Sequence, residues 1–224
     1  MKIILFGATG MVGQGVLREC LLDAKIEGVL AIGRTATGRA REKLREIVRE
    51  DMFTYADIED HLRGYDACFF CLGVTSAGMT EANYRHLTYD LALAAGEALA
   101  RINPGMTFIY VSGTGTDSTE RGRSMWARVK GATENALLRL PLAAYMFRPG
   151  VIQPMHGERS KTRLYRVMYV MTGWVIPVLI RVFPKYVTTT ERIGRAMIEV
   201  AKHGAPKKVL ETQDINELAR TIAP

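Results

Sequence analysis

Cysteine is scarce in this chain of 224 residues, which contains only Cys20, Cys68 and Cys71. Three thiols do not form the disulfide framework that is typical of small secreted domains. We also expect no secretion signal, because Lys2 is followed by a short apolar run that ends at Gly7. Both absences indicate a reducing compartment, and we expect a cytoplasmic protein.

Long hydrophobic runs are absent as well. The most apolar stretch, 164–184, has only 14 residues between Arg166 and Arg181, whereas a membrane-spanning helix needs about 20. The chain length predicts a single domain over 1–224, with 151–190 as an apolar lid or a subunit interface, as in a homodimer. Plain core and contact with a membrane surface are the alternatives for this segment.

Motifs for nucleic acids and metals are missing too. The net charge is +7, and arginines crowd 34–49, but no zinc, helix-turn-helix or RNA-stacking motif accompanies them. We therefore expect no specific nucleic-acid partner. Cys68 and Cys71 are three apart on a predicted strand and point to opposite faces, so they cannot hold a metal together. We predict no metal site.

A strand, a glycine turn and a helix are predicted at the start of the chain. The apolar run 3–6 is followed by Gly7, Gly10 and Gly13, and then by apolar residues at helical spacing. A helix that begins in such a turn offers free N–H groups and a positive dipole end to a pyrophosphate. We expect Gly7 to permit the tight turn, Gly10 to let the phosphates approach, and Gly13 to allow close helix packing.

Arginine stands where many dinucleotide-binding proteins have a carboxylate. Arg34 follows the second predicted strand, 28–33, and no Asp or Glu occurs before Glu42. A carboxylate here would bind the ribose 2′-OH of NAD, whereas an arginine pairs with the 2′-phosphate of NADP. The sequence therefore favours NADP(H) over NAD(H). Asp51 follows the weak third strand, 47–48, where the adenine pocket is expected.

Strands and helices alternate along the rest of the chain. Further strands are predicted over 67–72, 107–111, 142–147 and 208–210, and a long helix is predicted over 80–102. Thr188 and Glu191 have the spacing of a helix capping box. This alternation predicts an α/β fold of Rossmann type, with a doubly wound parallel sheet and ligands above the carboxyl ends of its strands.

The order of the motifs resembles that of the atypical short-chain dehydrogenase/reductases, an NAD(P)H-binding group that includes epimerase/dehydratase-like proteins. The resemblance rests on 7–13, Arg34, 71–73, the loop from Ser112, 129–131, 148–150 and 188–194. With Arg34 and Asp51, it implies cofactor contacts from Gly7, Thr9, Gly10, Met11, Val12, Gly13, Cys71, Leu72, Gly73, Lys130, Arg148 and Pro149. It also implies catalytic roles for Lys130 and for a hydroxyl, Ser112 or Thr114, with Ser112 preferred.

One residue departs from the pattern of this family. Its members use a Tyr-x-x-x-Lys pair in which the tyrosine is the general acid, but Trp126 stands four residues before Lys130. An indole N–H cannot exchange a proton near neutral pH. We expect an NADP(H)-dependent oxidoreductase for a small carbonyl, hydroxyl or quinone-like substrate. The alternative is a non-catalytic NADP(H)-binding regulator or redox sensor that acts through a protein partner.

Overall fold

The computed structural model describes residues 1–158 and 185–221, and within them seven parallel strands form the central sheet. The strand order is β3-β2-β1-β4-β5-β6-β9. The strands are β1 Lys2–Phe6, β2 Gly28–Gly33, β3 Leu44–Val48, β4 Ala67–Phe70, β5 Thr107–Val111, β6 Ala143–Arg148 and β9 Val209–Glu211. The chain runs outward from β1 to β3 and then returns to β4, so the order reverses between β1 and β4. This confirms the predicted doubly wound α/β fold.

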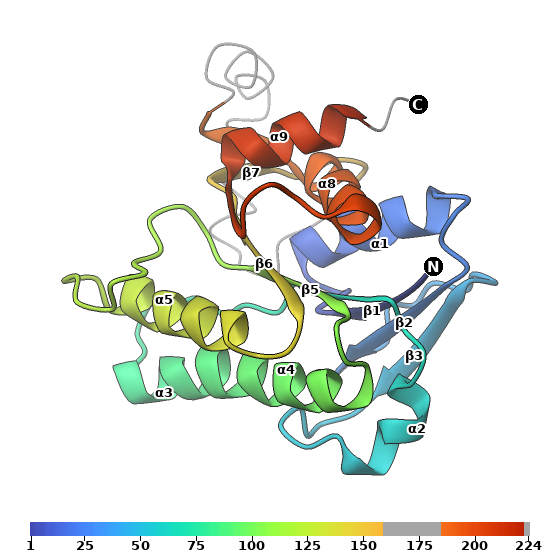
Figure 1. Cartoon of the computed structure of the whole chain (residues 1–224), viewed down its shortest axis with the longest axis horizontal. Helices are drawn as coiled ribbons and strands as arrows, with labels where there is room; N and C mark the ends of the chain where they lie inside the picture. Colours follow the sequence, from blue (N-terminus) through green and yellow to red (C-terminus); the bar gives the residue numbers. More distant parts are fainter. Residues whose placement is uncertain (159–184, 222–224) are drawn as a thin grey trace.

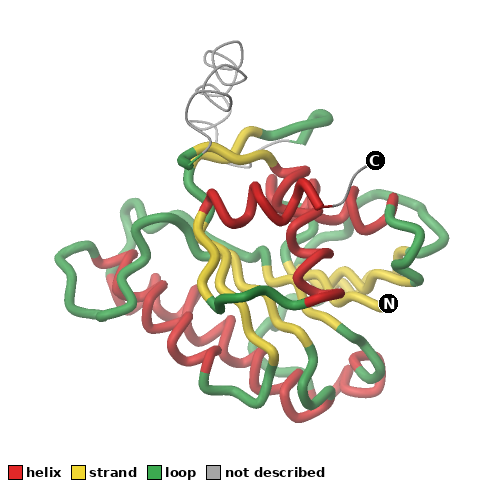
Figure 2. The backbone as a smooth tube through the Cα atoms, turned by 45° about the horizontal axis from the view of Figure 1, so that its top comes forward, coloured by secondary structure: helices red, strands yellow, loops and turns green. Residues whose placement is uncertain are grey.

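Helices cover both faces of the sheet (Figures 1 and 2). One face carries α1 Met11–Leu22, α8 Thr190–His203 and α9 Thr212–Thr221. The other carries η1 Ala56–Ile58, α2 Glu59–Leu62, α3 Glu81–Arg85, η2 His86–Asp90, α4 Leu91–Ile102 and α5 Met125–Leu138. A separate parallel pair is formed by β7 Val151–Gln153 and β8 Val187–Thr189.

The sheet is buried from both sides, which explains the continuous apolar runs of its strands. In β1, Ile3 and Leu5 belong to the core beneath α1 and α8, whereas Ile4 and Phe6 belong to the core beneath α2 and α4. All four side chains are fully buried. Burial of each such side chain contributes about 1.5–3 kcal/mol. The sheet is therefore a rigid platform for the loops at its carboxyl edge.

The contact between α1 and α8 depends on two glycines. A Cβ atom on Gly15 would lie 2.5 Å from the Cβ of Thr190, and one on Gly194 would lie 2.8 Å from the Cγ of Glu19. Larger residues at either position would push the helices apart. The carboxylate of Glu19, which is only 6% exposed, accepts a hydrogen bond of 3.1 Å from Nε of Arg195 on α8.

The long helix predicted over 80–102 is present, but a π-helical turn, η2, interrupts it between α3 and α4. Thr80 caps its start, because its hydroxyl accepts the N–H of Asn83. No helix in the described ranges is long and apolar enough to cross a membrane. The apolar stretch 164–184 lies outside the described residues, and the single domain over 1–224 stays a prediction.

The predicted capping box is wrong by one residue. Thr189, and not Thr188, is the N-cap of α8, since its hydroxyl accepts the N–H of Arg192 at 3.0 Å. The hydroxyl of Thr188 donates instead to Oδ1 of Asn216 on α9. The side chain of Glu191 pairs with Arg195 at 2.9 Å. Glu191 therefore supports the first turn of α8 from its surface.

Candidate cofactor site

The glycine turn joins β1 to α1 at the carboxyl edge of the sheet. Gly7 has φ +82°, a left-handed conformation, and a Cβ there would lie 2.8 Å from the backbone of Cys71 and Leu72. A Cβ on Gly13 would lie only 2.1 Å from the carbonyl oxygen of Gly7. The tight turn and the close helix packing that the sequence predicted are therefore both present, and each requires glycine.

The N-terminus of α1 has the donors that a pyrophosphate needs. Gly10 is the N-cap and has no side chain to satisfy the first helical N–H groups, and the first turn contains no acidic residue. The first N–H groups of a helix have no acceptor within the helix, and the dipole adds a positive partial charge. The residues at this turn fit the diphosphate of a dinucleotide. Met11 and Val12 provide the first two helical N–H groups.

A cavity of about 280 Å³ adjoins the turn. Its walls come from the glycine turn, the end of β2, the loop that follows β2, and β3. The lining residues are Gly7, Ala8, Thr9, Ala31, Ile32, Gly33, Arg34, Thr35, Thr37, Glu46, Ile47, Val48 and Leu72. A dinucleotide with its diphosphate at the start of α1 would place an adenosine here. The structure thus brings Gly7, Thr9, Arg34 and Leu72, four of the predicted cofactor contacts, to the wall of one cavity.

Arg34 and Glu46 line this cavity from different elements. Arg34 directly follows β2, is exposed, and forms no ion pair with any described residue. Glu46 lies on β3, opposite Ala31 of β2, and its carboxylate accepts the N–H of Thr37 at 2.7 Å. Glu46 was not among the predicted site residues, because the apolar pattern indicated the third strand only over 47–48, whereas β3 spans Leu44–Val48. Its residue type was visible, but its position in the fold was not.

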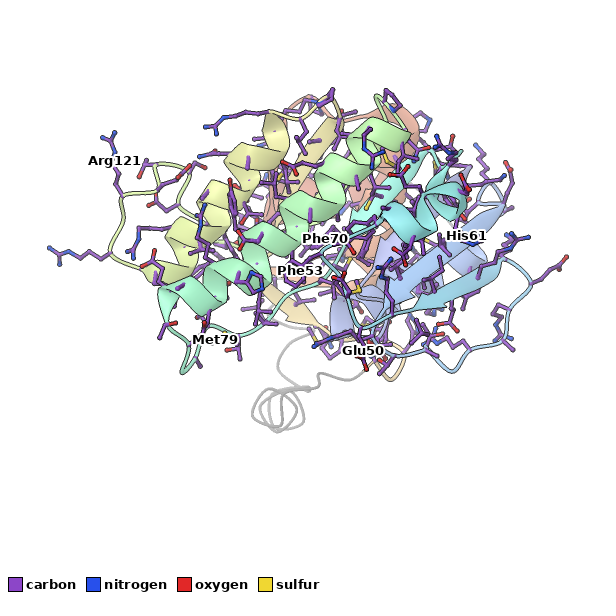
Figure 3. The ribbon with its side chains drawn as sticks, turned by 90° about the horizontal axis from the view of Figure 1, so that it is seen from below. Glu50, Phe53, His61, Phe70, Met79 and Arg121 are labelled. Atoms are coloured by element: carbon purple, nitrogen blue, oxygen red, sulfur yellow. The ribbon has the colours of Figure 1, made fainter. Side chains whose placement is uncertain are left out.

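Asp51 lies outside the lining of this cavity. Its carboxylate accepts the N–H of Phe53 at 2.7 Å and a hydrogen bond from the hydroxyl of Thr54. These bonds hold the pKa of Asp51 below its usual value. The ring of Phe53 stacks on His86 with the ring centroids 4.4 Å apart, and Figure 3 shows Phe53 below α4. Asp51 therefore shapes the loop after β3, and its contact with a cofactor stays a prediction.

A larger cavity, of about 320 Å³, lies at the opposite edge of the sheet. Its lining includes Lys2 and Gly28 at the starts of β1 and β2, Arg45, and His61 of α2, which is labelled in Figure 3. Doubly wound sheets bind ligands at the carboxyl ends of their strands. The size of a cavity is therefore not decisive, and the candidate cofactor site is the smaller cavity beside the glycine turn.

Cys71, Leu72 and Gly73 follow β4 and face the glycine turn across the strand-order reversal. Cys68 packs in the core under α4, whereas Cys71 packs against the core under α1. The two thiols thus point to opposite faces, as predicted. Burial raises the pKa of the Cys71 thiol. Among the described residues, no group of His, Cys, Asp and Glu side chains could hold a metal ion.

Ser112 lies at the end of β5 and is buried, with 7% exposure. Its hydroxyl donates to the carboxylate of Glu134 on α5 and to the carbonyl oxygen of Phe147 at 3.1 Å. Thr114 is exposed on the following loop, and its hydroxyl donates to the carbonyl oxygen of Arg148 at 3.0 Å. Of the two candidate hydroxyls, Ser112 is directed into the interior and Thr114 is at the surface.

Glu134 and Arg148 form a buried ion pair behind Ser112. Nε of Arg148 lies 3.0 and 3.2 Å from the two carboxylate oxygens of Glu134. The hydrogen bond to Glu134 raises the pKa of Arg148. The guanidinium also contacts Ser118 at 2.5 Å and Glu211 at 3.5 Å, so its donors are used within the protein. Pro149 follows it and is buried.

Lys130 and Trp126 lie one helical turn apart on α5. The ammonium of Lys130 donates to the carbonyl oxygen of Ser112. Burial lowers the pKa of Lys130 to about 8, although the charge of Glu134 acts in the opposite direction. The indole ring of Trp126 lies against Gly115, where a Cβ would be 3.3 Å from it. Trp126 therefore faces the same loop as Thr114, at the position where a Tyr-x-x-x-Lys pair would have its phenol.

The comparisons with known proteins agree with this architecture. No family model matches the chain. Leucinostatins biosynthesis cluster protein T of Purpureocillium lilacinum is 33% identical over 122 residues, which is 53% of this chain and 45% of that protein. Protein FMP52, mitochondrial, of Meyerozyma guilliermondii is 25% identical over 98% of this chain and 96% of its own.

Two solved structures superpose on nearly the whole chain. The oxidoreductase ylbE of Lactococcus lactis has a TM-score of 0.66 at 15% identity and covers 99% of this chain and 96% of its own. UDP-glucuronic acid 4-epimerase of Bacillus cereus, solved with NAD, has a TM-score of 0.66 at 15% identity and covers 99% of this chain and 84% of its own. The chain therefore shares the Rossmann-type fold of these two proteins.

The fold also explains which predicted residues assemble. Around the glycine turn, Gly7, Thr9, Arg34 and Leu72 share one cavity. Ser112, Lys130 and Arg148 meet at the ends of β5 and β6. Glu134, which was not predicted, binds Ser112 and Arg148, and its charge raises the pKa of Lys130 against the effect of burial. Its position four residues after Lys130, on the same face of α5, was a signal that could have found it.

Proposed function

We propose that this chain is an NADP(H)-dependent oxidoreductase that acts on a small carbonyl, hydroxyl or quinone-like compound. The observation that supports this proposal is the position of Arg34. Its guanidinium forms no ion pair with any residue that the structure describes. It lines the cavity beside the glycine turn, where the 2′-phosphate of NADP would lie if the diphosphate is held at the start of α1. The Bacillus cereus epimerase of the same fold binds NAD, so the fold itself leaves the choice of cofactor to such residues.

The preference for NADP(H) is tested by calorimetry with NADP⁺ and NAD⁺ on the unmodified chain and on Arg34→Ala. We expect NADP⁺ to bind about tenfold more tightly, because a charge-assisted hydrogen bond contributes about 1.5–3 kcal/mol. Arg34→Ala should remove most of this preference. Arg39→Ala is the matched control, since Arg39 is exposed on the same loop but outside the cavity lining. A lack of binding of both nucleotides would refute the proposal.

Catalysis would depend on the group around Lys130. When bound, the nicotinamide supplies or accepts the hydride. Trp126 cannot give a proton, so we assign the proton donor to the ammonium of Lys130, whose pKa of about 8 is suited to proton transfer near neutral pH. We assign the hydroxyl for the substrate oxygen to Thr114, because Thr114 is exposed whereas Ser112 is buried. The hydroxyl of Thr114 would exchange its bond to the carbonyl oxygen of Arg148 for one to the substrate.

Trp126 also supports a second candidate function. An indole that packs against Gly115 at the position expected for the catalytic phenol suits a protein that binds NADP(H) without reducing a substrate. Such a protein would be a regulator or redox sensor, and nucleotide binding would change its contact with a protein partner. The cytoplasmic location stays a prediction; the FMP52 relative is named as mitochondrial.

NADPH oxidation against a panel of carbonyl compounds and quinones distinguishes the two functions. If the chain is an enzyme, the unmodified protein is active and Lys130→Ala lowers kcat by at least about a hundredfold, the usual size of a general-acid effect. If it is a sensor, the unmodified protein is inactive with every compound while it binds NADPH. Activity that is present only in Trp126→Tyr would support the sensor.

A further inference from the structure

We propose that Glu46 is a specificity-determining residue that sets the balance between NADP(H) and NAD(H) together with Arg34. This inference rests on the proposed function, because it concerns the same adenosine cavity. Glu46 lines the cavity from β3, whereas Arg34 lines it from the end of β2. The two side chains bring opposite charges to one cavity from neighbouring strands, and the structure shows no ion pair between them.

Glu46 first acts on the loop that carries Arg34. Its carboxylate accepts the backbone N–H of Thr37, three residues after Arg34, at 2.7 Å. The hydroxyl of Thr37 in turn accepts the N–H of Arg39 at 3.2 Å. This chain of hydrogen bonds ties the loop after β2 to the edge strand β3. Glu46 therefore positions the backbone of Arg34 relative to the cavity.

The charge of Glu46 acts in the opposite direction. A 2′-phosphate carries almost two negative charges near pH 7, and a carboxylate on the wall of the same cavity repels it. A ribose 2′-OH is neutral and can instead donate a hydrogen bond to a carboxylate. By anchoring the loop after β2, Glu46 thus helps to hold Arg34 at the cavity. The negative charge of Glu46, in contrast, weakens the preference for NADP(H) over NAD(H) that Arg34 produces. The chain should accept both nucleotides, with a preference limited by Glu46.

Two substitutions separate these effects. Glu46→Gln keeps a side-chain oxygen that can accept the N–H of Thr37, but it removes the charge. Glu46→Ala removes both. Glu42→Gln is the matched control, because Glu42 is exposed, carries the same charge and lines only the cavity at the opposite edge of the sheet. Both positions, Glu46 and Glu42, are exposed, so the three variants should fold, which thermal unfolding checks.

The measurement is calorimetric binding of 2′,5′-ADP and 5′-AMP, which occupy only the adenosine part of the site, followed by NADP⁺ and NAD⁺. Glu46→Gln should bind 2′,5′-ADP about three- to fivefold more tightly at low salt and 5′-AMP within about twofold of the unmodified chain. The affinity for 2′,5′-ADP divided by that for 5′-AMP should be smaller in Glu46→Ala than in Glu46→Gln, because the loop that carries Arg34 is no longer anchored in Glu46→Ala.

The outcomes that would overturn the inference differ from those that would overturn the proposed function. The role of the Glu46 charge is refuted if the ratio of the two affinities in Glu46→Gln equals that in the unmodified chain, or if Glu42→Gln changes this ratio by the same factor. Equal ratios in Glu46→Ala and Glu46→Gln refute the anchoring role. If neither NADP⁺ nor NAD⁺ binds to the unmodified chain, the proposed function itself fails.

Discussion

Removal of one charge from the buried pair behind Ser112 should destabilise the whole fold. Glu134 is 1% exposed and the side chain of Arg148 is 12% exposed. Breaking a buried ion pair costs about 3–5 kcal/mol, because it leaves a charge without its partner in a poorly solvated place. In Glu134→Gln, the amide oxygen can still accept a hydrogen bond from Arg148, but among the described residues the carboxylate that remains beside this guanidinium is that of Glu211, at 3.5 Å. We therefore expect a loss near the lower limit, about 3 kcal/mol.

For a chain of this length, each kcal/mol lowers Tm by about 2–4 °C, so Glu134→Gln should unfold about 6–12 °C earlier. Urea titration gives the free energy of unfolding directly. Glu211→Gln is the matched control, because Glu211 is 47% exposed and lies 3.5 Å from Arg148. An exposed pair of this kind contributes about 1 kcal/mol or less. A loss in Glu134→Gln no greater than that in Glu211→Gln would refute the reasoning.

Two further predictions concern the glycine turn and Lys130. Gly13→Ala should abolish nucleotide binding, as measured by calorimetry, and lower Tm, because its Cβ would lie 2.1 Å from the backbone oxygen of Gly7. Gly28→Ala is the control and should do neither, because its Cβ would lie 3.9 Å from the nearest atom. Normal nucleotide binding by Gly13→Ala would contradict the close packing of α1 on the turn. The pKa of Lys130 is about 8 in the folded chain, below the ordinary value of about 10.4. Between pH 8 and about 10.4, Lys130 is therefore protonated in the unfolded chain but mostly deprotonated in the folded chain. The free energy of unfolding should rise with pH over this range. Urea unfolding at pH 7 and pH 9.5 should show the unmodified chain gaining stability relative to Lys130→Met, and a constant difference would contradict the lowered pKa.

Local patterns were sufficient to predict the sheet and the glycine turn. Parallel strands that are buried on both faces have unbroken apolar runs, and three glycines at fixed spacing permit few geometries. The opposite orientations of Cys68 and Cys71 also follow from strand geometry alone. These predictions depend only on neighbours in the sequence, which is why the structure confirms them.

Contacts between distant segments could not be predicted in the same way. The direction of the Ser112 hydroxyl depends on Glu134 and Phe147, which come from other elements. Glu46 reaches the cofactor cavity only because β3 pairs with β2 in one particular register. The capping position of α8 differed by one residue because Thr188 is used by β8 and Asn216. In each case the side chain found a partner that the local pattern did not contain.

The close contact of α1 with α8 has a consequence for the order in which the chain can fold. The helix α1, whose N-terminus forms part of the candidate cofactor site, is covered by residues that are synthesised much later, since Thr190 and Arg195 pack on Gly15 and Glu19. A nascent chain that has completed β1, α1 and β2 still exposes the apolar face of α1. The glycine turn therefore gains its full support only after synthesis reaches α8, and a truncation before that point should leave an aggregation-prone intermediate in place of a smaller nucleotide-binding protein.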